Sequence, residues 1–380
     1  MDNNYWQTGM DAVELIRCAL HGKQPAEPEN SNLEDIYRFC EFHSVTATAA
    51  TALEMLWKDN PPQDQETAGK FRQALARSMR KSILLNAERE QILQHLEQIG
   101  CWYMPLKGSL LQHDYPRFGM RQMSDNDILI DASMQEAVHS FLTGLGYEAV
   151  SYQITVENNY HKPPVYNFEM HTALFGMEAP AEFRTYYADV KQRLIPDEGR
   201  QYGYHFRPED FYIYMIAHAW KHASKSGIGI RFLADLWVWN RKHGAALNRD
   251  YVASELKKLG AAEFEQSSRQ LSGKLLDGPG AELSQQEREI LVRFFEAGTY
   301  GTPEQKMDNQ LNGKTGGAAK LRYVLSRVFP SAQTLSVVHP HVMEQKWRVP
   351  LIWIWRLIRA VFVTPVSTIR ELAMLIRKKR

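Results

Sequence analysis

Cysteine is scarce in this sequence. A chain of 380 residues contains three, widely separated, at Cys18, Cys40 and Cys101. An odd and scattered set cannot build a disulfide framework, and it lacks the paired spacing of a cysteine-based zinc site. Such usage is typical of a reducing compartment. Because the N-terminal residues also show no basic stretch followed by an apolar one, we expect a cytoplasmic protein without a signal peptide.

Long apolar runs are missing as well. The most lipid-like stretch, residues 351–363, contains Arg356 and Arg359 and is too short to span a bilayer, so we expect no transmembrane segment. The surrounding run 347–380 is basic and rich in tryptophan. Two interpretations of it stay open: a C-terminal helix lying on an anionic membrane or on RNA, or a helix closing a core.

Neither sign of charge is in excess, since 45 lysines and arginines balance 44 acidic residues to a formal charge of +1. This balance excludes a surface that is positive overall, as in a protein that coats nucleic acid, but it allows a local basic patch. An apolar content of 44% and a charged content of 23% are typical of a globular protein. At this length we expect about two or three compact units.

Hydrophobic periodicity divides the chain into three parts. Apolar residues recur at four-residue spacing from Phe71 to Ile83, which predicts a helix, and helical patterns return from Pro208 onward. Between them the pattern predicts short strands at 101–105, 124–131, 147–156 and 165–175, with helices starting at 108 and spanning 132–146. We therefore expect an α+β fold: an N-terminal helical segment at 1–95, a small α/β sheet domain at 96–180 and a C-terminal helical region at 181–380.

Acidic side chains gather on the predicted strands. Asp125 and Asp127 are two residues apart, so on a strand both carboxylates point to one face. Two ionised carboxylates repel each other, and a hard cation with oxygen ligands, Mg²⁺ before others, relieves the repulsion. The alternation of 165–171 places Glu169 and His171 opposite Phe168, where Glu169 adds a third acid. Three converging acids favour a two-metal site.

A phosphate-binding element is predicted just upstream. Lys107, Gly108 and Ser109 stand where a short strand passes into a helix. Free backbone N–H groups at such a junction favour an anion, Gly108 permits a phosphate to approach closely, and Ser109 adds a hydroxyl donor. A phosphate cradle followed by a carboxylate pair is what metal-assisted phosphoryl transfer requires. A lone Asp-x-Asp pair is also typical of a solvated strand end, and His171 equally fits a hydrogen-bonded strand histidine.

Residues 106–130, followed by the strand VYNFEMHTAL, resemble the bacterial family of uncharacterised nucleotidyltransferases within the polymerase-beta-like superfamily. The resemblance extends over most of the chain. It matches the family's phosphate element, its acidic pair and third acid, the lysine before the glycine, the arginine before the acidic pair and the Glu-x-His strand. The matching residues are Lys107, Gly108, Ser109, Arg121, Asp125, Asp127, Glu169 and His171.

This resemblance implies catalytic and metal-binding roles for Asp125, Asp127 and Glu169, with Glu169 completing the metal site or acting as a base. It implies nucleotide binding by Lys107, Gly108, Ser109 and Arg121, with His171 as an accessory residue. Mg²⁺ and a nucleoside triphosphate such as ATP would bind at the sheet edge, and a nucleotidyl group would pass to an unknown acceptor, which is a small molecule, a protein or an RNA.

Two departures from the superfamily pattern keep other functions open. The gap between Ser109 and Asp125 is long, and Asn126 replaces the usual hydrophobic or acidic residue within the acidic motif. Some members of the superfamily are catalytically inert. A non-catalytic nucleotide sensor or assembly partner using the same pocket is therefore one alternative. A membrane-surface adaptor acting through the basic C-terminal helix is the other.

Two further motifs do not predict a site. His218 and His222 have the spacing of metal ligands on a helix, but a zinc protease requires glutamate where Ala219 stands. We expect a helix-packing pair, with Asp235 as its hydrogen-bond partner. The run Gly-Lys-Thr at 313–315 resembles a P-loop but lacks the upstream glycine, because Asp308 occupies that position.

Overall fold

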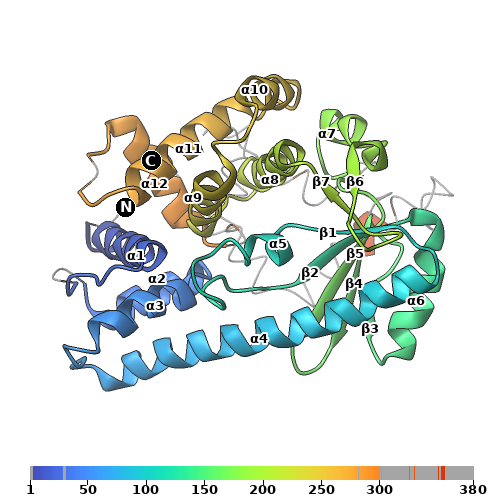
Figure 1. The fold of residues 1–380 in the computed structure, drawn as a ribbon. Helices are drawn as coiled ribbons and strands as arrows, with labels where there is room; N and C mark the ends of the chain where they lie inside the picture. Colours follow the sequence, from blue (N-terminus) through green and yellow to red (C-terminus); the bar gives the residue numbers. More distant parts are fainter. Residues whose placement is uncertain are drawn as a thin grey trace.

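A computed structural model describes residues 3–28, 31–280 and 282–299, together with residues 301, 325, 329, 350 and 352–355. The Gly-Lys-Thr run at 313–315 and most of the basic run 347–380 lie outside the described residues. In Figure 1 a small sheet occupies one end of the molecule, and most of the helices occupy the other end of the molecule. The fold is α+β, as the sequence predicts.

Four helices precede the sheet: α1 (Asn3–His21), α2 (Leu33–Phe42), α3 (Thr46–Leu56) and α4 (Gln65–Gln98). The long helix α4 runs from the helical end along the sheet (Figure 1). Its first half packs into the larger core through Phe71 and Leu75, and its second half reaches the core beneath the sheet through Ile92 and Leu96. The predicted apolar face is wrong at Ile83, which is 58% exposed.

The sheet has five strands in the order β1-β2-β5-β4-β3, and only the β2–β5 pair is parallel. The strands are β1 (Tyr103–Pro105), β2 (Asn126–Ile130), β3 (Glu148–Ser151), β4 (Glu157–Lys162) and β5 (Tyr166–His171). Short helices α5 (Gly108–Leu111) and α6 (Gln135–Gly144) connect them, with a 3-10 turn at Ala132–Met134.

The predicted strand boundaries need correction. The strand predicted at 124–131 begins at Asn126, the one predicted at 147–156 ends at Ser151, and β4 is not predicted at all. The inward positions of β4 are Asn158 and Tyr160, both buried. Because Asn158 is polar, the apolar alternation that reveals a strand is interrupted there.

After β5 the described chain continues with helices and one short hairpin. It contains α7 (Ala181–Tyr186), a 3-10 turn at Val190–Arg193, the hairpin β6 (Leu194–Pro196) and β7 (Tyr204–Phe206), and the helices α8 (Pro208–Ala223), α9 (Arg231–His243), α10 (Arg249–Lys258), α11 (Ala262–Leu276) and α12 (Gln285–Ala297). The helix predicted at 250–272 is divided into α10 and α11, because Gly260 adopts a positive φ of 61° between them.

Two hydrophobic cores result from this arrangement. The smaller lies between the sheet, α4 and α6, and the larger joins the N-terminal helices to α8, α9 and α11. Successive residues of β2 face different cores, since Ile128 belongs to the smaller and Leu129 to the larger. In the described part of the chain, no helix is long and apolar enough to cross a membrane. The domain boundaries predicted at residues 95 and 180 stay a prediction.

Candidate metal and nucleotide site

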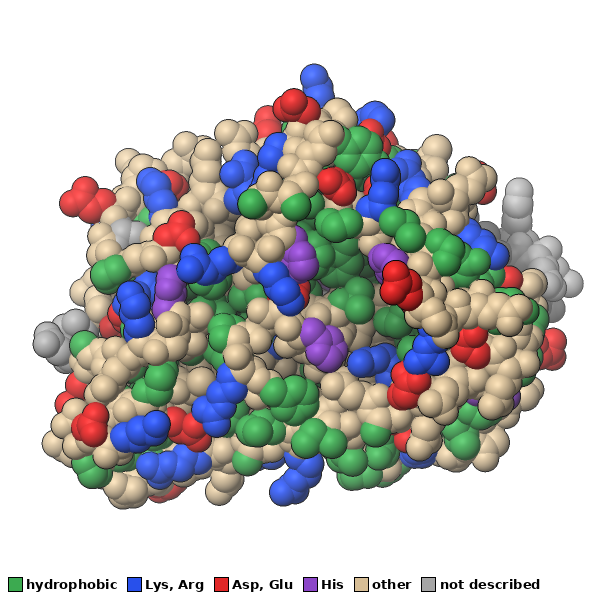
Figure 2. Space-filling model, viewed as in Figure 1, with side chains coloured by type: hydrophobic (Ala, Val, Ile, Leu, Met, Phe, Trp, Pro, Cys, Tyr) green, Lys and Arg blue, Asp and Glu red, His purple; other side chains and the backbone are tan. Residues whose placement is uncertain are grey.

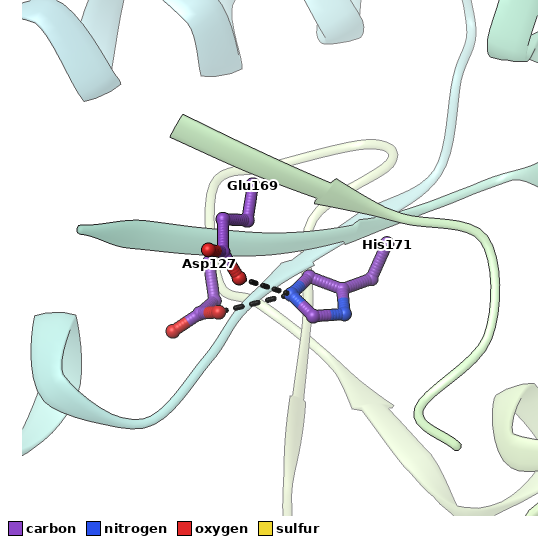
Figure 3. A group of neighbouring side chains, drawn as sticks. All are labelled: Asp127, Glu169 and His171. Carbon is purple, nitrogen blue, oxygen red and sulfur yellow. Dashed lines mark hydrogen bonds and ion pairs between the residues drawn. The ribbon is translucent and has the colours of Figure 1, made fainter. Parts of the chain in front are cut away.

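Parallel pairing of β2 and β5 sets the geometry of the acidic group, because Asp127 and Glu169 are register partners. Side chains at paired positions point to the same face of a sheet, and His171 follows two residues after Glu169 on that face. Figure 3 shows the imidazole of His171 directed toward both carboxylates. Its Nε2 lies 2.9 Å from Asp127 Oδ1 and 3.7 Å from Glu169 Oε2.

Asn126, in the middle of the acidic motif, has a structural role on the opposite face of β2. Asn126 points away from Asp127 and is completely buried. Its side-chain oxygen accepts a hydrogen bond of 2.7 Å from Arg89 Nη1 on α4. The asparagine therefore anchors the strand to α4, and the residue that departs from the superfamily pattern lies on the face without the acidic group.

Asp125 lies one residue before β2 begins, not on the strand, so the argument from strand spacing does not apply to it. It nevertheless borders the same cavity as Asp127 and Glu169. Among the described residues Asp125 forms no hydrogen bond and no close ion pair. All three predicted acids therefore face one space, although only Asp127 and Glu169 are held there by strand pairing.

The cavity has a volume of about 360 Å³ and lies between the open face of the sheet and the helices α8 and α9. Figure 2 shows this hollow between α8 and α5, with hydrophobic walls and with histidine, basic and acidic side chains near its rim. Its polar lining consists of Lys107, Arg121, Ser124, Asp125, Asp127, Glu157, Glu169, Tyr214, His218, Lys221, His222, Arg231, Asp235 and Thr299. A space of this size is typical of small-molecule sites.

Asp127 is held in its ionised form. Burial alone would raise the pKa of its carboxyl group, but the charge of Lys107 and the hydrogen bond from His171 outweigh burial and hold the pKa below its usual range. Lys107 Nζ lies 3.1 Å from Asp127 Oδ1. Burial would lower the pKa of Lys107, but the charge of Asp127 raises it above its usual value. The two groups form a buried ion pair.

The other two acids have the opposite shift. Burial, together with the charges of Asp127 and Asp125, raises the pKa of Glu169 to about 8. Burial and the charge of Asp127 also raise the pKa of Asp125. The site thus carries more carboxylate than Lys107 neutralises, and a divalent cation with oxygen ligands would relieve the excess. The donor set fits a metal ion.

His171 is better suited to orienting Asp127 than to binding the metal. Its Nδ1 is buried and has no hydrogen-bond partner among the described residues. If Nε2 bound a cation, the proton of the neutral ring would sit on Nδ1 as a buried donor without an acceptor, which is costly. If Nε2–H instead donates to Asp127, only a lone pair is left without a partner. We therefore assign the proton to Nε2.

The predicted phosphate element has a different internal structure. The hydroxyl of Ser109 is buried and donates to Leu106 O at 2.7 Å, and Ser109 does not border the cavity. Lys107 has a positive φ of 46°, a strained conformation of the kind that gathers at functional sites. A Cβ atom on Gly108 would lie 2.5 Å from Arg121 Nη1. Glycine is needed here to admit the guanidinium group.

Arg121 lies against Gly108 and is hydrogen-bonded to α9. Its Nε and Nη2 donate to the two carboxylate oxygens of Asp235 at 2.7 and 2.9 Å, and Tyr115 donates to the same carboxylate at 2.8 Å. The prediction that Asp235 bonds the histidine pair of α8 is therefore wrong. Phosphate binding by Gly108, Ser109 and Arg121 stays a prediction.

The histidines that the sequence reasoning set aside border the cavity. His218 Nε2 and His222 Nε2 lie 3.1 Å apart, and both rings line the space above the acidic group. Glu157 of the unpredicted strand β4, Tyr214, Lys221 and Arg231 are further lining residues that the sequence reasoning missed. The four-residue spacing did place the histidines on one helix face, but the sequence contains no sign of what that face contacts.

Comparison with known proteins adds one finding. Residues 29–277, more than half of the chain, match the model of a family described as an uncharacterised nucleotidyltransferase. This range includes every residue of the acidic group, the loop around Gly108, and helices α8 and α9. Neither a curated protein nor a solved structure matches the chain.

Proposed function

The chain belongs to a family of uncharacterised nucleotidyltransferases, and from that premise we propose that it transfers a nucleotidyl group in a metal-dependent reaction at the cavity floored by Asp125, Asp127 and Glu169. One observation carries the proposal. Register pairing of Asp127 with Glu169 directs two carboxylates, with Asp125 beside them, into a cavity of about 360 Å³, where burial and the neighbouring carboxylates raise the pKa of Glu169 to about 8.

Asp125, Asp127 and Glu169 are the residues that would hold Mg²⁺. When bound, such ions neutralise phosphate oxygens and activate the attacking oxygen, and three carboxylates together with the phosphates provide ligands for two ions. This mechanism is the one that the polymerase-beta-like superfamily implies. We further propose that the substrate is a nucleoside triphosphate such as ATP and that the reaction takes place in the cytoplasm.

The remaining residues of the site have supporting roles in this proposal. His171 donates from Nε2 to Asp127 and fixes the orientation of that carboxylate. Lys107, strained and partly buried beside Asp127, places a positive charge directly before Gly108. Ser109 and the Arg121–Asp235 pair hold the loop in shape. We propose that Lys107 and the backbone of Gly108 contribute contacts to the phosphate nearest the acidic group.

The proposed reaction balances as follows. The acceptor hydroxyl or phosphate oxygen forms a bond to the α-phosphorus of the triphosphate. The bond between the α-phosphorus and the bridging oxygen breaks, and pyrophosphate departs with the electron pair. A hydroxyl acceptor also loses its proton to solvent, whereas an ionised phosphate oxygen has none to lose. The acceptor is a small molecule, a protein or an RNA.

A specific observation favours a second candidate, a non-catalytic nucleotide sensor. Oδ1 of Asp127 already accepts from Lys107 and His171, and those donors compete with a metal ion for the same oxygen. A sensor needs to bind the nucleotide but not to break it. The third candidate, a membrane adaptor, depends on the run 347–380, nearly all of which lies outside the described residues.

Release of pyrophosphate distinguishes the first two candidates. Purified protein is incubated with Mg²⁺, each triphosphate and desalted cell extract as a source of acceptors, and pyrophosphate is measured with an enzyme-coupled assay. We expect release that requires Mg²⁺ and is lost in Asp125→Asn. Glu148→Gln, an exposed acid on β3 of the same sheet, is the matched control and should retain activity. Nucleotide binding without pyrophosphate release would favour the sensor.

A further inference from the structure

A pair of histidines on α8 has no role in the chemistry proposed so far. His218 and His222 are one helical turn apart, and their ring centroids are separated by 4.6 Å. Because Nε2 faces Nε2 at 3.1 Å, one ring donates and the other accepts. The accepting ring then carries its hydrogen on Nδ1 and can donate it to another partner, whereas Nδ1 of the donating ring has a lone pair. Both side chains border the same cavity as the acidic group.

The charges around the cavity are distributed unevenly. The sheet side contributes four acids, Asp125, Asp127, Glu157 and Glu169. On that side Lys107 pairs with Asp127, and Arg121 pairs with Asp235. The other basic and imidazole side chains that line the cavity belong to α8 or to the start of α9: His218, Lys221, His222 and Arg231.

This distribution restricts how a triphosphate can lie in the cavity. Its terminal phosphates are strongly anionic and are repelled by the carboxylates of the sheet. On the α8 wall, Lys221 Nζ lies 3.7 Å from Glu157 and 3.6 Å from Glu178. The neutral donors of that wall, an imidazole N–H of the histidine pair and the hydroxyl of Tyr214, can instead donate to phosphate oxygens. A triphosphate that reacts at the acidic floor would then place its α-phosphate there and its β- and γ-phosphates toward α8.

Tyr214 provides an independent observation at the same wall. It lies one turn before His218 on α8, borders the cavity and is only 1% exposed. Its hydroxyl has no hydrogen-bond partner among the described residues. A buried hydroxyl without a partner is unfavourable, and a phosphate oxygen in the cavity would satisfy it.

A zinc site at the histidine pair is less well supported. The spacing suits two ligands of one ion, but a structural or catalytic zinc site needs at least three protein ligands. In the described part of the chain the group of three metal-binding side chains is Asp127, Glu169 and His171, and it does not include the pair.

We propose that the free N–H of the His218–His222 pair and the hydroxyl of Tyr214 on the same helix bind the β- and γ-phosphates of the nucleoside triphosphate, so that α8 forms the subsite of the leaving pyrophosphate. This inference rests on the proposed function. It assigns residues of α8 to the terminal phosphates of the proposed substrate. The pair contacts the leaving group, whereas Asp125, Asp127 and Glu169 serve the phosphorus under attack.

The test compares ligands that differ in their phosphates. Dissociation constants for ATP, AMP and inorganic pyrophosphate, each with Mg²⁺, are measured by calorimetry on the full chain. The variants are His222→Gln and the double change His218→Leu with His222→Leu. The matched control is His95→Gln, a helical histidine on α4 that stacks on Phe141 and does not border the cavity.

In the double variant we expect the affinity for ATP and for pyrophosphate to fall about tenfold or more, because hydrogen bonds to charged groups are lost. The affinity for AMP should change less than twofold. His222→Gln, which keeps one donor, should lose less, and it tests the proposal if the double variant does not fold. His95→Gln should match the wild type for all three ligands.

Two results would overturn the assignment. Unchanged affinities for ATP and for pyrophosphate in a folded variant mean that the pair does not contact the terminal phosphates. An equal loss for ATP and AMP means that the pair only supports the shape of the cavity. The proposed function fails separately, and this inference with it, if the wild-type protein binds neither ATP nor pyrophosphate in the presence of Mg²⁺.

Discussion

Replacing Glu169 by glutamine should remove one pH-dependent contribution to the stability of the metal-free protein. The pKa of Glu169 is about 8 in the folded state, against 4.5 in an exposed glutamate. Between these values the unfolded chain has already lost the proton while the folded protein still holds it. The contribution of Glu169 to the free energy of unfolding therefore decreases as pH rises from 4.5 to 8, and it levels off above pH 8.

The size of this effect follows from the same two pKa values. Each pH unit within the window corresponds to about 1.4 kcal/mol, so the wild type should lose roughly 2–3 kcal/mol between pH 5 and pH 7 relative to Glu169→Gln. For a chain of this length that is a shift of about 3 °C in the melting temperature. Glutamine keeps the shape of the side chain but has no proton to lose.

The assay is a melting series in EDTA from pH 5 to pH 8.5 on the wild type, Glu169→Gln and the control Glu148→Gln. We expect the wild type and Glu148→Gln to show the same pH dependence, and both to lose about 2–3 kcal/mol relative to Glu169→Gln between pH 5 and pH 7. If all three proteins show the same pH dependence, Glu169 is not held next to ionised Asp127 in a buried site, and the electrostatic argument for a metal ion fails.

Three further predictions concern the site and the fold. Asp127→Asn should destabilise the metal-free protein by about 2–3 kcal/mol, because it leaves Lys107 buried without its counter-charge; an increase in chemical denaturation midpoint would contradict the ion pair of 3.1 Å. Gly108→Ala should cost about 1–3 kcal/mol by displacing the guanidinium of Arg121, and a melting temperature equal to that of the wild type would show that the loop has room. Buried His43, whose pKa is lowered by burial to about 3, should make the protein lose about 2 kcal/mol between pH 7 and pH 5; the same acid sensitivity in His43→Gln would refute this assignment.

Local patterns in the sequence were sufficient to predict much of the sheet. Alternation revealed β5, with Phe168 and Met170 in the core and Glu169 on the other face. Strand β4 was missed because buried Asn158 interrupts the apolar pattern. Period and alternation report only the face on which a residue lies, so an inward asparagine is indistinguishable from a residue in a loop.

The cavity as a whole was beyond such reasoning, because its two walls are distant in the chain. Asp127 and His218 are brought to one space by the packing of α8 and α9 over the sheet, and no short-range pattern reports that contact. The arginine partner of Asp235 was missed for the same reason. Gly108 was identified as important, but the structure shows that Arg121 approaches it, which the sequence could not reveal.

The most direct test of the central claim is the combined effect of Mg²⁺ and a nucleoside triphosphate on the melting temperature of Asp125→Asn. Asp125 makes no hydrogen bond or close ion pair with the described residues, so this change removes one proposed metal ligand while the fold stays intact. We predict that the wild type is stabilised more by Mg²⁺ with ATP or another triphosphate than by either alone, as linked binding to the folded state requires. Asp125→Asn should lose that joint stabilisation, and Glu148→Gln should keep it. Full joint stabilisation of Asp125→Asn, or none in the wild type with any triphosphate, would contradict a metal and nucleotide site at this cavity.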